Sequence, residues 1–276
     1  MLYVRGHPRD YDLWRQAGCE GWSYADALPY LRRAEGNWRG ESAFPGGSGP
    51  LGVSATSVKN LNFPLIRDTA RNAGIPFTKD FSGAEPDGLG AVDLTIKDGV
   101  RQSASRLFAP EGYPSLNHPE SRGEVRLASA NPNDSPLIHL NALSTEGDRA
   151  RACECIRLVR RIYGTQPLAD LIVHETSPGP DIVSDADLDA FTRRSAEVGH
   201  HPAGTYAMGA SPQAVVDSQL RVRGLGGLRV VDASVMPSVP GGNTNAPTII
   251  IAERAADLIR GRPTLAPAHD TRLATE

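Results

Sequence analysis

A block near the C-terminus, His200-His201-Pro-Ala-Gly-Thr-Tyr-Ala-Met-Gly209, constrains the fold more than any other part of the sequence. Pro202 lacks a backbone N–H and Gly204 favours a turn, so the chain cannot continue as a helix here. The imidazole of His201 therefore lies on a fixed loop, which is how proteins present general bases. A structural histidine hydrogen-bonded to backbone is the alternative. Adjacent side chains diverge, so at most one of His200 and His201 faces a given pocket.

A second block, Val231-Asp232-Ala-Ser-Val-Met-Pro237, places a carboxylate directly after an apolar segment. The composition of residues 228–231 predicts a buried strand, and ligands bind at strand ends in open sheets. Asp232 is therefore a candidate binding residue. Its alternative role is to cap the segment that follows it.

A third block, Gly242-Asn243-Thr-Asn245-Ala-Pro247, carries two carboxamides. If the backbone is extended, Asn243 and Asn245 lie on the same side of it. A carboxamide can donate a hydrogen bond to an alkoxide or to a phosphate oxygen. Gly241-Gly242-Asn243 is also strong turn chemistry by itself, so a purely structural turn stays open as an alternative.

Apolar periodicity predicts a mixed architecture. Turn residues precede the first of five predicted helices, which span 23–35, 60–74, 145–163, 185–198 and 246–259. The predicted strands span 88–96, 124–127 and 228–231, with turns at 98–99 and 131–136. Because helices and short strands occur without regular βαβ alternation, we expect an α+β fold built on an antiparallel sheet with flanking helices.

Charge and cysteine content exclude several classes of protein. The net charge is −3 and the arginines are scattered, which argues against nucleic acid as a partner. Cys19, Cys153 and Cys155 give no disulfide framework, so we expect reduced thiols in a cytoplasmic protein. The N-terminus is charged where a signal peptide needs an apolar run, and Ile249–Ala252 is too short to span a membrane.

Histidine spacing argues against a metal site. His174 with Glu175, and His200 with His201, lack the spacing that places zinc ligands on one helical face. We therefore expect no metal.

Taken in order, the C-terminal blocks resemble the glucose–methanol–choline (GMC) flavoprotein oxidoreductases, and choline or aliphatic alcohol dehydrogenases most closely. The matching run covers residues 196–261 and ends in a helix containing Ala-Glu-Arg-Ala-Ala-Asp. Near the N-terminus, Met1-Leu-Tyr-Val-Arg-Gly-His-Pro-Arg-Asp-Tyr-Asp-Leu-Trp14 and Gly21-Trp-Ser-Tyr24 resemble the family's segment leading into its substrate domain.

The resemblance implies that FAD is the cofactor and that a small alcohol is oxidised to an aldehyde. His201 would accept the hydroxyl proton and Asn243 would hydrogen-bond to the same oxygen, while the hydride would pass to the flavin. The positions implied to line the cofactor are Asp232, Ala233, Asn245 and Thr248. Choline would need an anionic or aromatic site for its ammonium group, for which Asp93 and Glu175 are candidates, although surface solvation is the favoured role of each.

The resemblance also implies a division of the chain. Residues 1–225 correspond to a substrate-binding domain, 226–262 to a C-terminal segment of the FAD-binding domain, and 263–276 to a flexible tail. A strand, G-x-G-x-x-G loop and helix that begin the family's dinucleotide fold have no counterpart here. A short link near 107–118 replaces a longer excursion of the flavin domain.

We therefore expect a truncated oxidoreductase chain that is inactive alone. The alternative from another class is a non-catalytic interaction module. Without a parallel sheet to cover them, strand 228–231 and helix 246–259 would expose apolar surface. That C-terminal apolar face would then dock a separate flavin-domain subunit or associate with itself.

Overall fold

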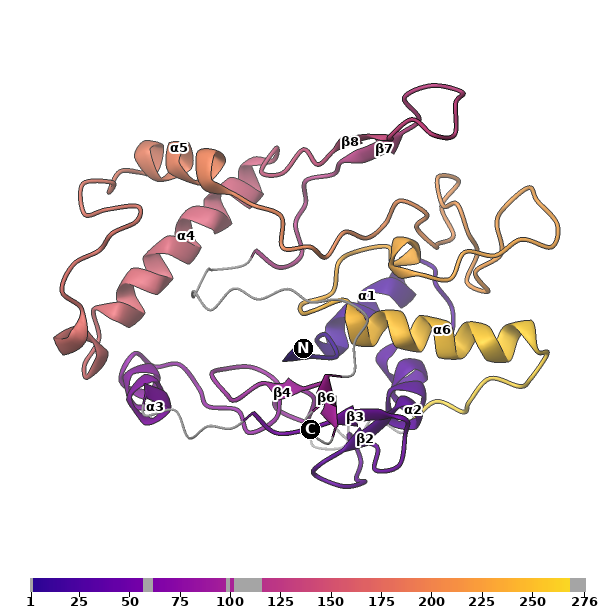
Figure 1. Cartoon of the computed structure of the whole chain (residues 1–276), viewed down its shortest axis with the longest axis horizontal. Helices are drawn as coiled ribbons and strands as arrows, with labels where there is room; N and C mark the ends of the chain where they lie inside the picture. Colours follow the sequence, from indigo (N-terminus) through magenta and orange to yellow (C-terminus); the bar gives the residue numbers. More distant parts are fainter. Residues whose placement is uncertain (1, 57–61, 98–99, 102–115, 269–276) are drawn as a thin grey trace. The chain divides into compact units, whose positions relative to one another are not determined.

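The computed structural model describes residues 2–56, 62–97, 100–101 and 116–268 (Figure 1). Contacts divide the chain into two compact units. Unit 1 comprises Met1–Asn60, Pro76–Ala109 and His201–Glu276, whereas unit 2 comprises Leu61–Ile75 and Pro110–His200. These units are defined by contacts within this chain. The predicted domain boundaries after residues 225 and 262 are based on the family resemblance and stay a prediction.

The described residues form helices and small two-stranded sheets, which confirms the predicted α+β class. In unit 1, β1 (Leu2–Tyr3) pairs antiparallel with β4 (Asp93–Leu94), and β5 (Ile96–Lys97) pairs antiparallel with β6 (Val100–Arg101). One pair, β2 (Glu35–Asn37) with β3 (Leu51–Val53), is parallel, which the prediction of an antiparallel sheet did not include.

The strand predicted at 88–96 is shorter than expected, because regular pairing begins only at Asp93 and is interrupted before Ile96. The turn predicted at 98–99 lies outside the described residues. The segment 228–231 is not a buried strand. Leu228 is 50% exposed, and the backbone there is tied to its own loop by bonds such as Val222 N–H to the carbonyl of Leu228.

Three helices build the core of unit 1: α1 (Pro8–Gln16), α2 (Tyr24–Ala34) and α6 (Asn245–Ile259). The sequence predicted turns in the region of α1, and the structure shows a helix there instead. His7 caps it by accepting a bond from the backbone of Arg9, and Asp10 reciprocates by accepting from the N–H of His7. Histidine is an uncommon cap, which is why the start of this helix was missed.

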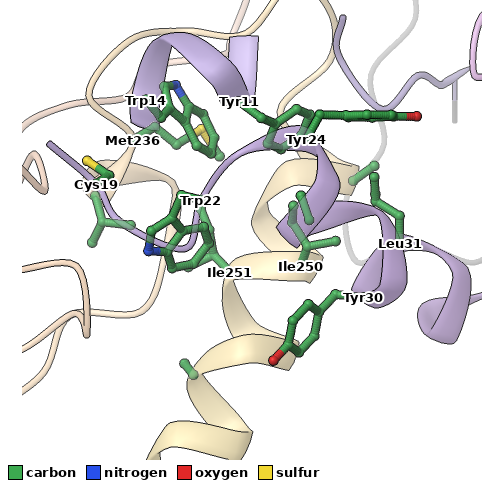
Figure 2. Close-up of a cluster of buried hydrophobic side chains, with 14 of the residues drawn as sticks. Tyr11, Trp14, Cys19, Trp22, Tyr24, Tyr30, Leu31, Met236, Ile250 and Ile251 are labelled. Carbon is green, nitrogen blue, oxygen red and sulfur yellow. The ribbon is translucent and has the colours of Figure 1, made fainter. Parts of the chain in front are cut away.

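Helix α2 packs directly against α6, and the aromatic side chains of Trp22 and Tyr30 lie beside Ile251 and Ile250 (Figure 2). Ile250, Ile251 and Ala255 are almost fully buried. The expectation that helix 246–259 exposes its apolar face is therefore wrong for these three residues. Their burial is supplied by α2 instead of a parallel sheet.

A proline inside α2 creates an attachment point for the C-terminal segment. Pro29 has no N–H to donate to the carbonyl of Ala25, four residues earlier. That carbonyl accepts from the N–H of Ala268 at 2.8 Å. The N–H of Leu265 donates to the hydroxyl of Tyr30 at 3.1 Å. Leu265 and Ala268 of the predicted flexible tail are thus hydrogen-bonded to α2, while 269–276 lie outside the described residues.

A buried polar network fixes the N-terminal strand of unit 1. Glu35 pairs with Arg5 and accepts a hydrogen bond from the Tyr3 hydroxyl, and it also accepts from the N–H of Gly46 at 2.8 Å. Burial, together with the charge of Glu35, raises the pKa of Tyr3 despite the opposing charge of Arg5. The network therefore neutralises a charged pair that has no access to solvent.

Unit 2 is built on helices α3 (Asn62–Asn72), α4 (Glu146–Tyr163) and α5 (Asp185–Ser195), with a 3₁₀ turn η1 (Leu168–Leu171). All three helices were predicted. The hairpin of β7 (Glu124–Arg126) and β8 (Leu137–His139) matches the strand and turn expected at 124–136.

The core of unit 2 is small. It consists of Cys153, Ile156 and Leu188, with Ile182 and Phe191 packed against them. All three cysteines of the chain are free. Among the helices that the structure describes, none combines the length and apolar character needed to cross a bilayer.

Candidate active site

The two residues predicted to share a substrate oxygen lie in contact in unit 1. The side-chain nitrogen Nδ2 of Asn243 is 2.8 Å from Nε2 of His201, although 42 positions separate the two residues. On the other side of the ring, Nδ1 of His201 is 3.0 Å from the hydroxyl of Thr244. All three side chains are half-buried. The ring is thus held between two consecutive residues of a single turn.

Backbone pairing brings the His201 loop beside the second polar block. The N–H of Tyr206 donates to the carbonyl of Ser234 at 3.0 Å, and the N–H of Met208 donates to that of Val235 at 2.8 Å. Gly204 begins this stretch with φ of +91°, a conformation that glycine adopts without strain. The loop that Pro202 and Gly204 impose on the sequence therefore fixes where the imidazole lies.

The turn that carries Asn243 is anchored to α1. The carboxylate of Asp10 accepts from the N–H of Gly241 at 2.7 Å, across 231 positions of sequence. The indole N–H of Trp14 lies 3.2 Å from the hydroxyl oxygen of Ser238. A side chain at position 242 would meet Val4 at 2.8 Å, so only glycine fits there. The sequence did not predict that Asp10 and Trp14 hold the turn that carries Asn243, because local sequence patterns carry no information about contacts between such distant positions.

The predicted cofactor residues fall into two places. Asp232 is exposed and caps the short helix η2 (Ala233–Val235), accepting from the N–H of Ser234 at 2.8 Å. Asp232 therefore has the capping contact that the sequence suggested as its alternative role. The next residue, Ala233, is half-buried. Asn245 and Thr248 lie in the first turn of α6, where Asn245 is exposed and the Thr248 hydroxyl donates to the carbonyl of Thr244.

The first turn of α6 fits the ring end of a flavin. It contains no acidic residue, and the Thr244 side chain caps none of its N–H groups. Unsatisfied N–H groups at a helix N-terminus favour an electron-rich ligand. Asn245, Thr248 and the neighbouring His201 are therefore suitably placed to hold the redox end of FAD.

The dinucleotide end of FAD finds no such fit in the described residues. Gly47-Ser-Gly49-Pro-Leu-Gly52 has the G-x-G-x-x-G spacing but leads into β3 instead of a helix. A side chain at Gly49 would meet the backbone of Ala34 at 2.4 Å, so this glycine serves the close packing of the loop on α2. A pyrophosphate site needs a helix N-terminus at that point.

The carboxylates considered for a cationic substrate are already paired. Asp93 is buried, forms an ion pair with Arg39 and accepts from the indole N–H of Trp38 at 3.1 Å. Glu175 pairs with Arg160 at 3.0 Å. Surface solvation is therefore wrong as the role of Asp93. Within the described part of the chain, no three metal-ligating side chains gather into a possible metal site.

Comparison with known families identifies the class of protein to which this fold and site belong. One model of "GMC oxidoreductase" matches residues 1–117 and a second matches 119–252, so that together they cover most of the chain. The chain belongs to the GMC oxidoreductase family. The boundary between the two matches falls at the short link predicted near 107–118.

Curated relatives include choline dehydrogenases. The chain is 28% identical to the oxygen-dependent choline dehydrogenase of Vibrio vulnificus, over 97% of this chain and 80% of that protein. It is 29% identical to the mitochondrial choline dehydrogenase of Mus musculus, over 96% and 74%. The Vibrio alignment extends over 447 positions, more than the 276 residues of this chain, so stretches of that relative have no counterpart here.

Solved structures agree on the fold. The crystal structure of pyridoxine 4-oxidase from Mesorbium loti matches with a TM-score of 0.82 and 22% identity, over 95% of this chain and 82% of that one. A formate oxidase variant of Aspergillus oryzae matches with a TM-score of 0.75 and 16% identity, over 94% and 82%. At these identities the likeness concerns the fold alone.

Proposed function

We propose that this chain carries the alcohol-binding and proton-accepting half of an FAD-dependent oxidoreductase that converts a CH–OH group to an aldehyde. The contact between His201 Nε2 and Asn243 Nδ2 is the observation that carries the proposal. This contact supports a pairing of base and hydrogen-bond donor at one oxygen atom. Relatives named as choline dehydrogenases support an alcohol as substrate.

In this mechanism His201 accepts the hydroxyl proton at Nε2, and the amide of Asn243 donates to the oxygen as negative charge develops. The amide now faces the nitrogen that must receive the proton. An entering hydroxyl group therefore takes the place of this contact, and both side chains turn towards the oxygen. A positioned base of this kind contributes about 10²–10⁴-fold to the rate.

The cofactor would be held by the residues that begin α6 and η2. Asn245 and Thr248 would contact it from the first turn of α6, with Asp232 and Ala233 on the adjoining segment. When bound, FAD supplies the acceptor for the hydride that leaves the alcohol carbon. The exposed amide of Asn245 remains available for this contact, whereas Thr248 must share its hydroxyl with the carbonyl of Thr244.

We expect the isolated chain to be inactive, because its described residues offer no site for the dinucleotide end of FAD. In this proposal a separate flavin-domain subunit would bind that end of the cofactor. The second candidate function is a non-catalytic module that docks such a subunit or itself. It is favoured by the same absence and by the apolar residues of α6 that stay partly or fully accessible, Ile249, Ala252 and Ile259.

The test supplies the missing region as a second polypeptide. The purified chain is mixed with FAD and with the stretches of the Vibrio vulnificus relative that have no counterpart here. Flavin absorbance and reduction of an artificial dye are measured with choline and with uncharged primary alcohols. We expect dye reduction that His201→Gln lowers by about 10²-fold or more while flavin absorbance is retained.

The two candidate functions give different results in this experiment. Association of the two polypeptides without dye reduction by any alcohol would favour the non-catalytic module. Because Asp93 and Glu175 already pair with arginines, neither offers a free negative charge to a quaternary ammonium group. We therefore expect uncharged alcohols to be oxidised at least as fast as choline.

A further inference from the structure

The orientation of the His201 ring depends on which ring nitrogen carries the proton. A neutral imidazole has one donor and one acceptor nitrogen, and the partners of the two atoms decide between them. The amide nitrogen Nδ2 of Asn243 can only donate, and it lies 2.8 Å from Nε2. Nε2 is therefore the acceptor, which leaves the proton on Nδ1.

The hydroxyl of Thr244 is the partner of that proton, at 3.0 Å from Nδ1. Thr244 is the N-cap residue of α6, where a threonine hydroxyl ordinarily accepts from the N–H of the second or third helical residue. It makes no such bond here. The third helical position is Pro247, which has no N–H to offer. The proline thereby removes one of the two competitors for the hydroxyl, which bonds to the histidine instead.

We propose that Thr244 is a positioning residue: its hydroxyl accepts the Nδ1 proton of His201 and, together with the donor of Asn243, holds the tautomer that has a lone pair on Nε2. This inference rests on the proposed function, because the tautomer matters for catalysis only if His201 accepts a proton from a substrate hydroxyl. Only the tautomer with a lone pair on Nε2 can do so. The opposite tautomer would direct an N–H at the substrate. Pro247 belongs to the same arrangement, because it removes one of the two backbone donors that could compete for the hydroxyl.

The opposite arrangement is chemically self-consistent and is what a test must exclude. A hydroxyl can donate as well as accept, so Thr244 could donate to Nδ1 if the amide of Asn243 were turned round. Nε2 would then carry the proton. Nitrogen chemical shifts distinguish the two tautomers directly, because protonated and unprotonated ring nitrogens resonate far apart.

The experiment is ¹⁵N NMR of the imidazoles in the full chain without FAD, at about pH 8, where a histidine of ordinary pKa is neutral. The His201 signals are assigned by their loss in His201→Gln. We expect a protonated-type shift for Nδ1 and an unprotonated-type shift for Nε2. In Thr244→Val, which keeps the shape but loses the hydroxyl, Nδ1 loses its acceptor and this preference weakens, although the donor of Asn243 remains. Thr244→Ser restores it.

A protonated-type shift on Nε2 in the unmodified chain would overturn the proposal without any variant. So would an unchanged tautomer in Thr244→Val. The result does not depend on activity. If the tautomer follows Thr244 but no alcohol is oxidised in the presence of FAD and the missing region, the positioning role stands and the proposed function fails.

Discussion

At the scale of single residues, the candidate site depends on a carboxylate at the other end of the sequence. Asp10 completes the cap of α1 through the N–H of His7 and anchors the turn that carries Asn243 through the N–H of Gly241, each at 2.7 Å. The side chain is almost fully buried. One group therefore sets both the start of a helix and the place of Asn243.

We predict that Asp10→Ala lowers the free energy of unfolding by about 1–3 kcal/mol for each buried N–H that it leaves without a partner. Urea unfolding followed by tryptophan fluorescence measures the change. Asp10→Asn is the matched control, since it keeps one oxygen acceptor, and its loss should be smaller. Equal stability of the alanine variant and the unmodified chain would show that solvent satisfies both N–H groups.

A second carboxylate makes the stability of unit 2 depend on pH. Burial alone would raise the pKa of Asp148, but it accepts bonds from the hydroxyl and N–H of Ser121, the N–H of Glu120 and the side chain of Arg151. These bonds outweigh the desolvation and hold the pKa well below its ordinary value.

The sign of the pH effect follows from this shift. The unfolded chain binds the proton more tightly, so the stabilisation is present above about pH 4 and is lost as the pH falls towards the lower pKa of the folded state. We predict that the urea midpoint, followed by far-UV circular dichroism, falls between about pH 5 and pH 2 more steeply than in Asp148→Asn. Parallel pH profiles for the two proteins would contradict this.

The sequence could predict that His201 and Asn243 form a pair. It could not predict which residues hold them in place. The distances confirm that His201 and Asn243 meet, while their catalytic and substrate-binding roles stay predictions. The sequence was compatible with either a ligand-binding or a capping role for Asp232, and its contact with Ser234 favours capping. Asp10 and Thr244 act through contacts that depend on how distant segments pack, and spacing along a chain holds no signal for such contacts.

At the scale of elements, the helices with clear apolar periodicity were predicted and the irregular elements were not. The cap of α1 uses a histidine, and the segment 228–231 pairs with residues 220–222 of its own loop through an isolated bridge instead of forming a regular strand. Composition shows that a segment is apolar. Whether a partner strand exists is decided elsewhere in the chain.

The proline in α2 yields an element-scale prediction. In Pro29→Ala, the new N–H at position 29 can bond to the carbonyl of Ala25 and compete with the N–H of Ala268. We expect faster hydrogen exchange at the Ala268 amide and earlier proteolysis after residue 262. Tyr30→Phe is the control, because it removes the neighbouring attachment at Leu265 and leaves α2 unchanged. Unaltered exchange would mean that the carbonyl accepts both bonds.

At the scale of the whole molecule, the two units differ in how much core they possess. Among the described residues, unit 1 contains a large cluster of aromatic and aliphatic side chains, whereas the apolar cluster of unit 2 has three buried members. The three tryptophans of the chain, Trp14, Trp22 and Trp38, all belong to unit 1. Tryptophan fluorescence therefore reports the unfolding of unit 1, while circular dichroism reports helices of both units.

We predict that Leu188→Ala, in unit 2, lowers the circular dichroism midpoint and leaves the tryptophan midpoint nearly unchanged. Leu188 is fully buried, and a leucine-to-alanine change at such a site costs about 2–5 kcal/mol. Leu31→Ala is the matched variant in unit 1 and should move the tryptophan midpoint. If Leu188→Ala shifts both signals equally, the two units unfold as one cooperative body.

The bond from Gly241 to Asp10 also has a consequence for biosynthesis. Its partners are 231 positions apart, and ribosomes add about 5–20 residues per second. The first two helices therefore leave the ribosome roughly 10–45 seconds before the helix that covers them. During that interval Trp14, Trp22 and Tyr30 lack their final neighbours, which makes the nascent chain a natural client for chaperones.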